Sequence, residues 1–146
     1  MEHTNQTSIK PKKIKLDFKE SKYATGRRKR SIAKVWVKKG NGNIHVNGLK
    51  MNEYFKRPVH QIIVTRPLEI SEVASNYDVK CSVKGGGLSG QAGAIILGIS
   101  KALIAHDEKL KKNLKKDKLT TRDSRVVERK KYGHKKARRS FQFSKR

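Results

Sequence analysis

The sequence is poor in the residues that form disulfides, metal centres and catalytic sites. Cys81 is the only cysteine, so no disulfide can form within the chain. The five histidines are scattered, and no Cys/His spacing matches a zinc site. No nucleophile–base pair, pair of carboxylates or metal cluster can be recognised. The sequence therefore predicts neither a cofactor nor a metal ion, and it argues against an enzyme.

Long apolar runs and a targeting segment are also missing. The most apolar stretch, 94–105, is interrupted by Ser100 and Lys101 and is shorter than the roughly 20 residues that span a bilayer. Residues 1–20 contain no apolar signal core and no arginine, and they carry three acidic side chains, which disfavours a transit peptide. We therefore expect no membrane partner.

Acidic side chains are scarce, and this scarcity is the strongest indication of function. Twelve Asp and Glu oppose 37 Lys and Arg, which gives a net charge of +25. Each phosphate neutralised by Lys or Arg releases a condensed counterion, so a polyanion binds more tightly as cations accumulate. Soluble domains usually mix both signs of charge. We interpret the excess as a nucleic-acid-binding surface, with an anionic membrane surface as the main alternative.

The positive charge is concentrated at the two ends of the chain. Residues 41–105 have a net charge of only +3, whereas the residues before them carry +10 and those after them +12. The weakly charged middle predicts one folded body with one core, because it is too short for two domains. The predicted parts are a basic mobile N-terminal extension at 1–22, a globular RNA-binding domain at 23–106, and a basic helical segment with an extended C-terminal tail at 107–146.

A glycine-rich loop joins a predicted strand to a predicted helix. Residues 77–84 alternate apolar and polar side chains, as a half-buried strand does, and apolar residues recur with helical spacing over 88–105. The intervening GGGLSG at 85–90 matches G-x-G-x-x-G, a fingerprint of dinucleotide sites. Such a site also needs an acid at the end of a second strand about 20 residues later, but Asp107 and Glu108 lie among lysines. A nucleotide-binding enzyme is therefore an alternative with little support.

The remaining predicted elements are short. The runs 31–39 and 43–47 flank Gly and Asn turn residues, so we expect them to form a β-hairpin. A helical turn is expected at 51–55. The proline that begins 67–75 suits the first position of a helix. The run 59–64 is compatible with either a strand or a helix.

The end of the chain combines cations with aromatic rings. The segment KKYGHKKARRSFQFSKR at 130–146 holds eight Lys and Arg, three aromatic residues and no acid. It cannot bury enough apolar surface to fold alone, but it can follow a phosphate backbone and stack rings on unpaired bases, which favours RNA. Without RNA, we expect 1–22 and 128–146 to be disordered.

Four motifs follow one another along most of the chain. They are YATGRRKRSIAKVWVKKGNGNIHVNG at 23–48, GGGLSGQAGAIILGISKAL at 85–103, LTTRDSRVVERKKYG at 119–133 and KARRSFQFSKR at 136–146. Together they resemble the motifs of small-subunit ribosomal protein nine, and they are most similar to bacterial and organellar members, closest to alphaproteobacterial and mitochondrial ones. Residues 1–22 lie outside this resemblance.

The resemblance implies a fold, a place and partners. The fold is α+β, a two-layer sandwich with a mainly antiparallel sheet and a left-handed βαβ crossover, as in the second domain of ribosomal protein S5. The place is the head of the small subunit, in a cytoplasmic bacterial ribosome or an organellar one. The implied partners are small-subunit rRNA, neighbouring head proteins and the anticodon stem-loop of P-site tRNA. Another kind of basic RNA-binding protein is the alternative.

The resemblance and the charge pattern together predict the binding residues. For rRNA they are Arg27, Arg28, Lys29, Arg30, Gly85, Gly86, Gly87, Gln91, Arg122, Arg125, Arg129, Lys130, Lys131, Lys135, Lys136, Arg138 and Arg139. For P-site tRNA they are Ser144, Lys145 and Arg146. Four consecutive cations would point to both faces of a strand, so we expect 25–31 to be irregular or at a sheet edge. The three loop glycines should approach an rRNA phosphate, unless a tight turn alone requires them.

Overall fold

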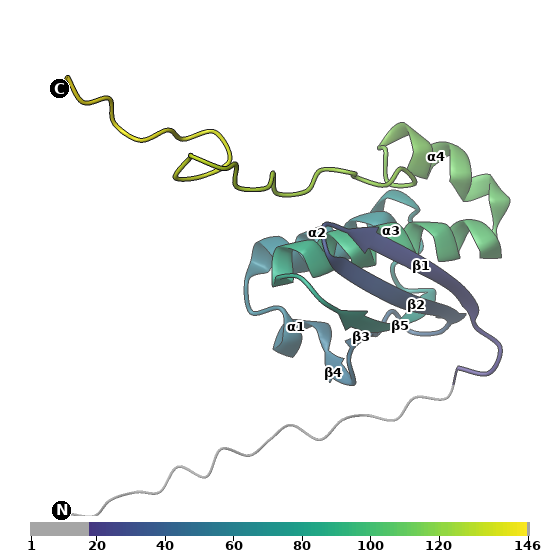
Figure 1. The fold of residues 1–146 in the computed structure, drawn as a ribbon. Helices are drawn as coiled ribbons and strands as arrows, with labels where there is room; N and C mark the ends of the chain where they lie inside the picture. Colours follow the sequence, from purple (N-terminus) through teal and green to yellow (C-terminus); the bar gives the residue numbers. More distant parts are fainter. Residues whose placement is uncertain (1–17, 146) are drawn as a thin grey trace, which may run out of the picture.

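The computed structural model describes residues 18–145, so the predictions for residues 1–17 and for Arg146 lie outside the described residues. A sheet and a layer of helices form a body, and a long C-terminal segment leaves it (Figure 1). In chain order the elements are β1 (Lys22–Arg28), β2 (Ser31–Lys39), β3 (Ile44–Val46), β4 (Leu49–Lys50), α1 (Met51–Tyr54), α2 (Pro58–Ile70), β5 (Tyr77–Lys84), α3 (Leu88–His106), the 3-10 helix η1 (Glu108–Leu110) and α4 (Lys111–Lys116). The predicted α+β class and mainly antiparallel sheet are confirmed.

The five strands are ordered β1-β2-β5-β3-β4, and only β3 and β5 run parallel. The predicted hairpin between 31–39 and 43–47 is therefore wrong, because β5 lies between β2 and β3. β5 buries Val79 and Val83 on one face and supplies a full ladder to β2, which the three-residue β3 cannot do. The connection from β3 to β5 passes through β4, α1 and α2, and it is the crossover of the parallel pair.

The core lies between the sheet and the two long helices, α2 and α3. Val35 and Val37 of β2 are fully buried, as are Ile95 and Ile99 of α3. α3 approaches β1 closely, because a Cβ at Gly26 would overlap the backbone of α3. Cys81 is buried in the central strand, and this burial raises the pKa of its thiol above the ordinary value. It is a packed apolar residue, as its strand position predicts.

α3 has 19 residues and a mean hydropathy of 1.5, so by length and composition it could cross a membrane. The apolar run expected over 94–105 thus belongs to a longer apolar helix. Within the body, 61% of it is buried, which is what the core helix of a soluble protein also shows. The buried side of α3 packs against the sheet and α2.

α2 corrects another prediction. Pro58, not Pro67, stands at the start of a helix, and Pro67 lies inside α2. The helix predicted over 67–75 is therefore wrong. The β-branched run before Pro67 favours a strand by propensity, but His60, Val64 and Leu68 recur every four residues and are buried. Packing of that stripe decides the structure in favour of a helix, because tertiary contacts override weak local preferences.

The C-terminal part begins with short helices and continues as an extended chain. Leu114 of α4 and Leu119 are buried and hold this region to the body. From residue 120 to 145 the described chain contains turns but no helix or strand. In Figure 1 this segment runs from α4 past the helical layer and ends away from the body. We call residues 120–145 the tail.

Candidate nucleic-acid interface

An acidic residue fixes the start of the tail to the body. The Asp123 carboxylate lies 3.3 Å from Arg28 Nη2 and 3.0 Å from Arg125 Nη2, and it accepts a further hydrogen bond from the Arg125 backbone N–H. The Arg28 side chain reaches it by crossing α3 at Gly93, where a Cβ would overlap the guanidinium stem. Hydrogen bonds from Arg125 hold the pKa of Asp123 below its ordinary value and raise that of Arg125. Two predicted RNA-binding arginines thus share one carboxylate.

The four consecutive cations lie at the edge of the sheet, as predicted. Arg27 and Arg28 end the edge strand β1, and Lys29 and Arg30 form the turn to β2. Lys29 has φ 50°, a value that few residues with a side chain adopt. Among residues 18–145, only Arg28 of these four forms an ion pair with an acid. The other three side chains are exposed and free of acidic partners in that range.

The three glycines of the loop differ in what the fold demands of them. Gly85 and Gly86 have φ 74° and 62°, and a Cβ on either would meet Arg30 or Ser31 of the β1–β2 turn. Ser31 Oγ donates to the Gly85 carbonyl at 2.9 Å, which ties the two turns together. Gly87 has no positive φ, and a Cβ there would meet nothing within 4 Å. A tight turn therefore explains the first two glycines, whereas the third is the N-cap of α3 and has no steric need to be glycine.

Gln91 braces this loop from the first turn of α3. Its Nε2 donates to the Gly85 carbonyl at 3.2 Å, and its Oε1 accepts from the Tyr54 hydroxyl at 2.7 Å. Both ends of the amide thus have protein partners. Gln91 was predicted to bind rRNA, and the structure gives it a part in shaping the loop.

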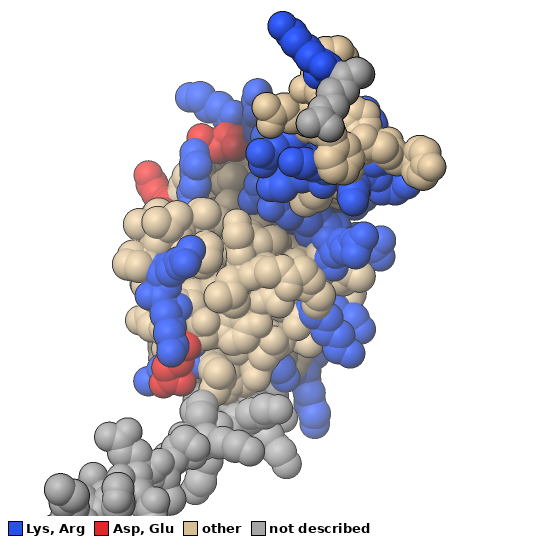
Figure 2. All heavy atoms as spheres, turned by 60° about the vertical axis from the view of Figure 1, so that its left-hand side comes forward, with Lys and Arg blue, Asp and Glu red and all other residues tan. Residues whose placement is uncertain are grey.

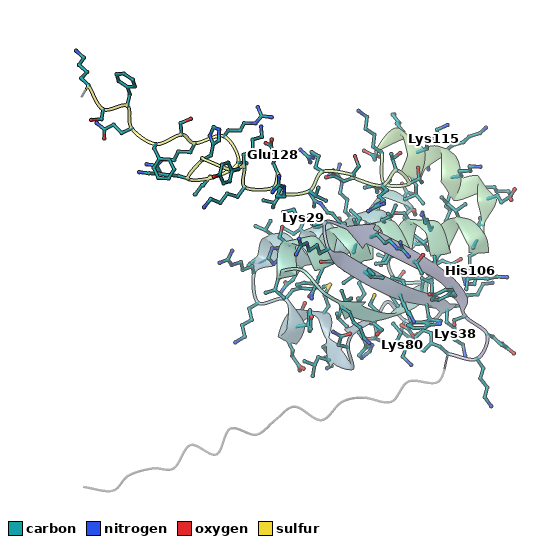
Figure 3. The ribbon with its side chains drawn as sticks, viewed as in Figure 1. Lys29, Lys38, Lys80, His106, Lys115 and Glu128 are labelled. Atoms are coloured by element: carbon teal, nitrogen blue, oxygen red, sulfur yellow. The ribbon has the colours of Figure 1, made fainter. Side chains whose placement is uncertain are left out.

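A cleft of about 620 Å³ separates the glycine loop from the tail. One wall carries Lys29, Arg30 and Gly87, and the other is formed by the tail residues 126–129. Figure 3 shows Lys29 on the body and Glu128 on the passing tail. α3 begins at this cleft without a side-chain cap, so its first backbone N–H groups need a partner from outside the helix. Cations and unpaired N–H groups together suit an anion.

The tail carries most of the predicted RNA-binding residues on its surface. Glu128 accepts from Arg138 at 2.9 Å and lies 3.4 Å from Lys131, so the tail folds back on itself. Lys135 Nζ lies 5.4 Å from the centre of the Phe141 ring. The exposed cations of this region gather around the upper part of the view in Figure 2. The predicted tail residues that are exposed are Arg122, Arg125, Arg129, Lys130, Lys131, Lys135, Lys136, Arg138, Arg139, Ser144 and Lys145.

The sequence analysis did not predict which basic side chains form ion pairs with acids of the chain and which do not. Asp123 and Glu128 each pair with two basic side chains, which leaves the neighbouring arginines and lysines for other partners. The sequence did show these two acids, each isolated among basic residues, in RDSR at 122–125 and ERKK at 128–131. Within residues 18–145, no group of three His, Cys, Asp or Glu could hold a metal ion.

A basic α+β body with a cationic tail and a cleft lined by Lys29, Arg30 and Arg129 defines a nucleic-acid-binding protein. The family model described as "Ribosomal protein S9/S16" matches residues 26–146, and the chain belongs to that family. It is therefore a structural protein of the small ribosomal subunit that binds rRNA. The family is not a class of enzymes, in agreement with the sequence.

Proposed function

We propose that the cleft and the tail form one continuous rRNA-binding surface in the head of the subunit, and that the final residues reach P-site tRNA. The observation that carries this proposal is the open side of Gly87. That residue has no steric need for glycine within the protein, and it lies between Lys29, Arg30 and the uncapped start of α3. Close approach of a nucleic-acid backbone supplies the missing reason.

The cations around the cleft would neutralise phosphates without reading base sequence. Arg30 and Arg129 can each present a planar fork of N–H donors, which suits phosphate oxygens. Asp123 holds the start of the tail to Arg28 of the body, and Glu128 folds the tail back on itself through Arg138. Backbone contacts of this kind fix the position and orientation of a protein on RNA. Neighbouring head proteins would adjoin this surface in a bacterial or organellar ribosome.

The reach of the tail supports a second RNA partner. The 24 residues from Arg122 to Lys145 could span up to about 80 Å if fully extended. The final described residues, Ser144 and Lys145, are exposed and lie away from the body (Figure 1). Lys145 and Arg146 have no acidic neighbour in the last 17 residues. These two cations suit the phosphates of the anticodon stem-loop of P-site tRNA.

The tRNA contact is tested by deleting residues 144–146 and measuring the dissociation of tRNA from the P site of assembled ribosomes. We expect faster dissociation with normal subunit assembly, because rRNA contacts upstream are retained. A variant with Ser144→Ala alone keeps both cations and should speed tRNA dissociation much less than the deletion does. Unchanged dissociation after the deletion would rule out the tRNA contact, and an assembly defect would assign these residues to rRNA.

A further inference from the structure

The sheet has a second face, on the side opposite to α2 and α3. The strand register places Tyr23, Trp36, Lys80 and His45 in one row across β1, β2, β5 and β3. These residues alternate with the buried valines of the same strands, so they point away from the core. No described helix packs on this side. The row is therefore the centre of an open sheet face.

The open face is strongly basic. Neighbouring rows add further cations, and the only acid that the register places on β1, β2 or β5 of this face is Asp78. The Asp78 carboxylate already accepts from the backbone N–H groups of Asn41 and Asn43 at 3.0 and 2.8 Å. Figure 3 shows Lys38 and Lys80 together, on the side of the sheet away from the tail. The cations of the face are Arg27, Lys34, Lys38, Lys50, Lys80 and Lys84.

Aromatic rings lie among these cations. The Tyr23 and Trp36 rings are 5.3 Å apart and tilted by 43°, and Tyr23 is 49% exposed. Lys80 Nζ lies 5.9 Å from the Trp36 ring centre and 5.7 Å from that of Phe18. Tyr23 is exposed, whereas Trp36 and Phe18 are half-buried. Rings that reach the surface between cations let a base stack while phosphates are neutralised. A face that only had to be soluble would need no such pair of rings.

We propose that this open sheet face binds an unpaired segment of RNA, with a base stacked on Tyr23 and Trp36 and phosphates on the surrounding lysines. Unpaired bases are required because the bases of a duplex are stacked on one another and cannot reach the rings. The face lies on the other side of the sheet from α3 and the tail. The chain thus joins two separate RNA segments.

Charge identifies RNA as the occupant. The chain's own residues 1–17 hold four lysines and two acids, so they would bring like charge to a basic surface. A protein partner would need an acidic surface to match the face. RNA supplies a dense negative charge and flat bases at once.

Trp36 is the only tryptophan in the chain, so its fluorescence reports on this face alone. The full chain should be titrated with an oligouridylate of about ten nucleotides. We expect saturable quenching of Trp36. Binding to the cleft and tail is followed separately by the anisotropy of a labelled copy of the same RNA. A rise in anisotropy without quenching would overturn the proposal and leave the cleft and tail surface standing.

Two matched pairs of variants separate charge from stacking. Lys34→Glu with Lys84→Glu should weaken the quenching titration by about tenfold, because phosphate contacts are lost. Lys101→Glu with Lys112→Glu, two exposed changes on α3 and α4, should alter it less than twofold. If the double variant does not fold, the second pair decides. Tyr23→Phe keeps a ring and should retain the affinity, whereas Tyr23→Ala should weaken it by about tenfold. Equal affinity for the two would overturn the stacking.

Assembled subunits provide the remaining test. Ultraviolet cross-linking should join Tyr23 or Trp36 to an rRNA nucleotide. Cross-links from these two residues to another protein, with none to rRNA, would overturn the proposal and make the face a protein interface.

Discussion

At the scale of single residues, the glycine loop separates the demands of folding from those of binding. Gly86 has φ 62° and lies against the Ser31 side chain, whereas Gly87 lies at the start of α3, which has no side-chain cap, with open space where a Cβ would lie. The two neighbours therefore serve different purposes although they look alike in the sequence. Substitution at each should affect a different measured quantity.

Gly86→Ala should destabilise the body, because a left-handed conformation costs about 1–2 kcal/mol for a residue with a Cβ and Ser31 must also move. Gly87→Ala should change the free energy of unfolding by less than about 0.5 kcal/mol. It should instead weaken RNA binding at the cleft. Urea unfolding and RNA titration of both variants check this. Full RNA affinity in Gly87→Ala would contradict the phosphate contact.

Asp123 provides a prediction that depends on pH. Its pKa is lowered in the folded chain by the hydrogen bonds from Arg125, so the ion pairs are fully formed above the ordinary Asp value of about 4. They are lost only as the pH falls below that value. The Arg28 Nε–H resonance in NMR spectra should therefore be constant from neutral pH down to about 5.

Asp123→Asn should shift that resonance at every pH, because Arg28 loses its acidic partner. Asp117→Asn is the matched control, since Asp117 lies near Arg66 at 3.7 Å and far along the chain from Arg28. A resonance that moves equally in both variants would show that Asp123 does not hold Arg28.

At the scale of elements, the sequence predicted those with a clear period and missed those decided by long-range pairing. The strand over 77–84 and the helix over 88–105 agree with β5 and α3, because alternation and helical spacing follow from one buried face. The hairpin failed because no local pattern shows that a strand 30 residues later enters between two others. Pro67 was misplaced because a buried stripe outweighs the local effect of proline.

The candidate site followed the same rule. Clusters of cations could be found by composition, so the β1–β2 turn and the tail were identified as basic segments. Their arrangement required three dimensions: only the fold brings Asp123 to Arg28 and the tail to the glycine loop. Gly85 and Gly87 also differ in backbone φ, which is positive only at Gly85, and the sequence does not show this difference.

The tail as an element should be open to solvent in the absence of RNA. Its described backbone–backbone hydrogen bonds within 120–145 are confined to the loop that folds back at 131–139, and one further backbone N–H, that of Arg125, donates to the Asp123 carboxylate. Amide hydrogens outside that loop, other than that of Arg125, should exchange at close to the rate of an unfolded peptide, whereas those of β2, β5 and α3 should be protected. Hydrogen exchange of the free chain measures this. Strong protection along the whole tail would contradict the prediction.

At the scale of the whole molecule, the body should fold without the end of the chain. Removal of residues 130–146 takes away eight cations but none of the buried apolar residues, so the free energy of unfolding should be unchanged. Binding to rRNA should become less dependent on salt. The slope of log K against log salt concentration should become shallower by up to about 0.9 for each phosphate contact that is lost. Head assembly should be impaired.

Urea unfolding, rRNA titration at several salt concentrations and subunit assembly test this truncation. A chain with Lys101→Glu and Lys112→Glu, both exposed changes, serves as a control for loss of charge elsewhere. A salt dependence equal to that of the complete chain would show that the tail does not contact phosphates.

The central place of β5 also determines when the molecule can fold as it is being synthesised. β2 and β3 cannot be joined until residue 84 has emerged, and α3 must follow to residue 106 before β1 and β2 are covered. Until then the apolar faces of β1 and β2 remain exposed to water and to other nascent chains. The apolar core of this protein can therefore close only after the residues of α3 have emerged.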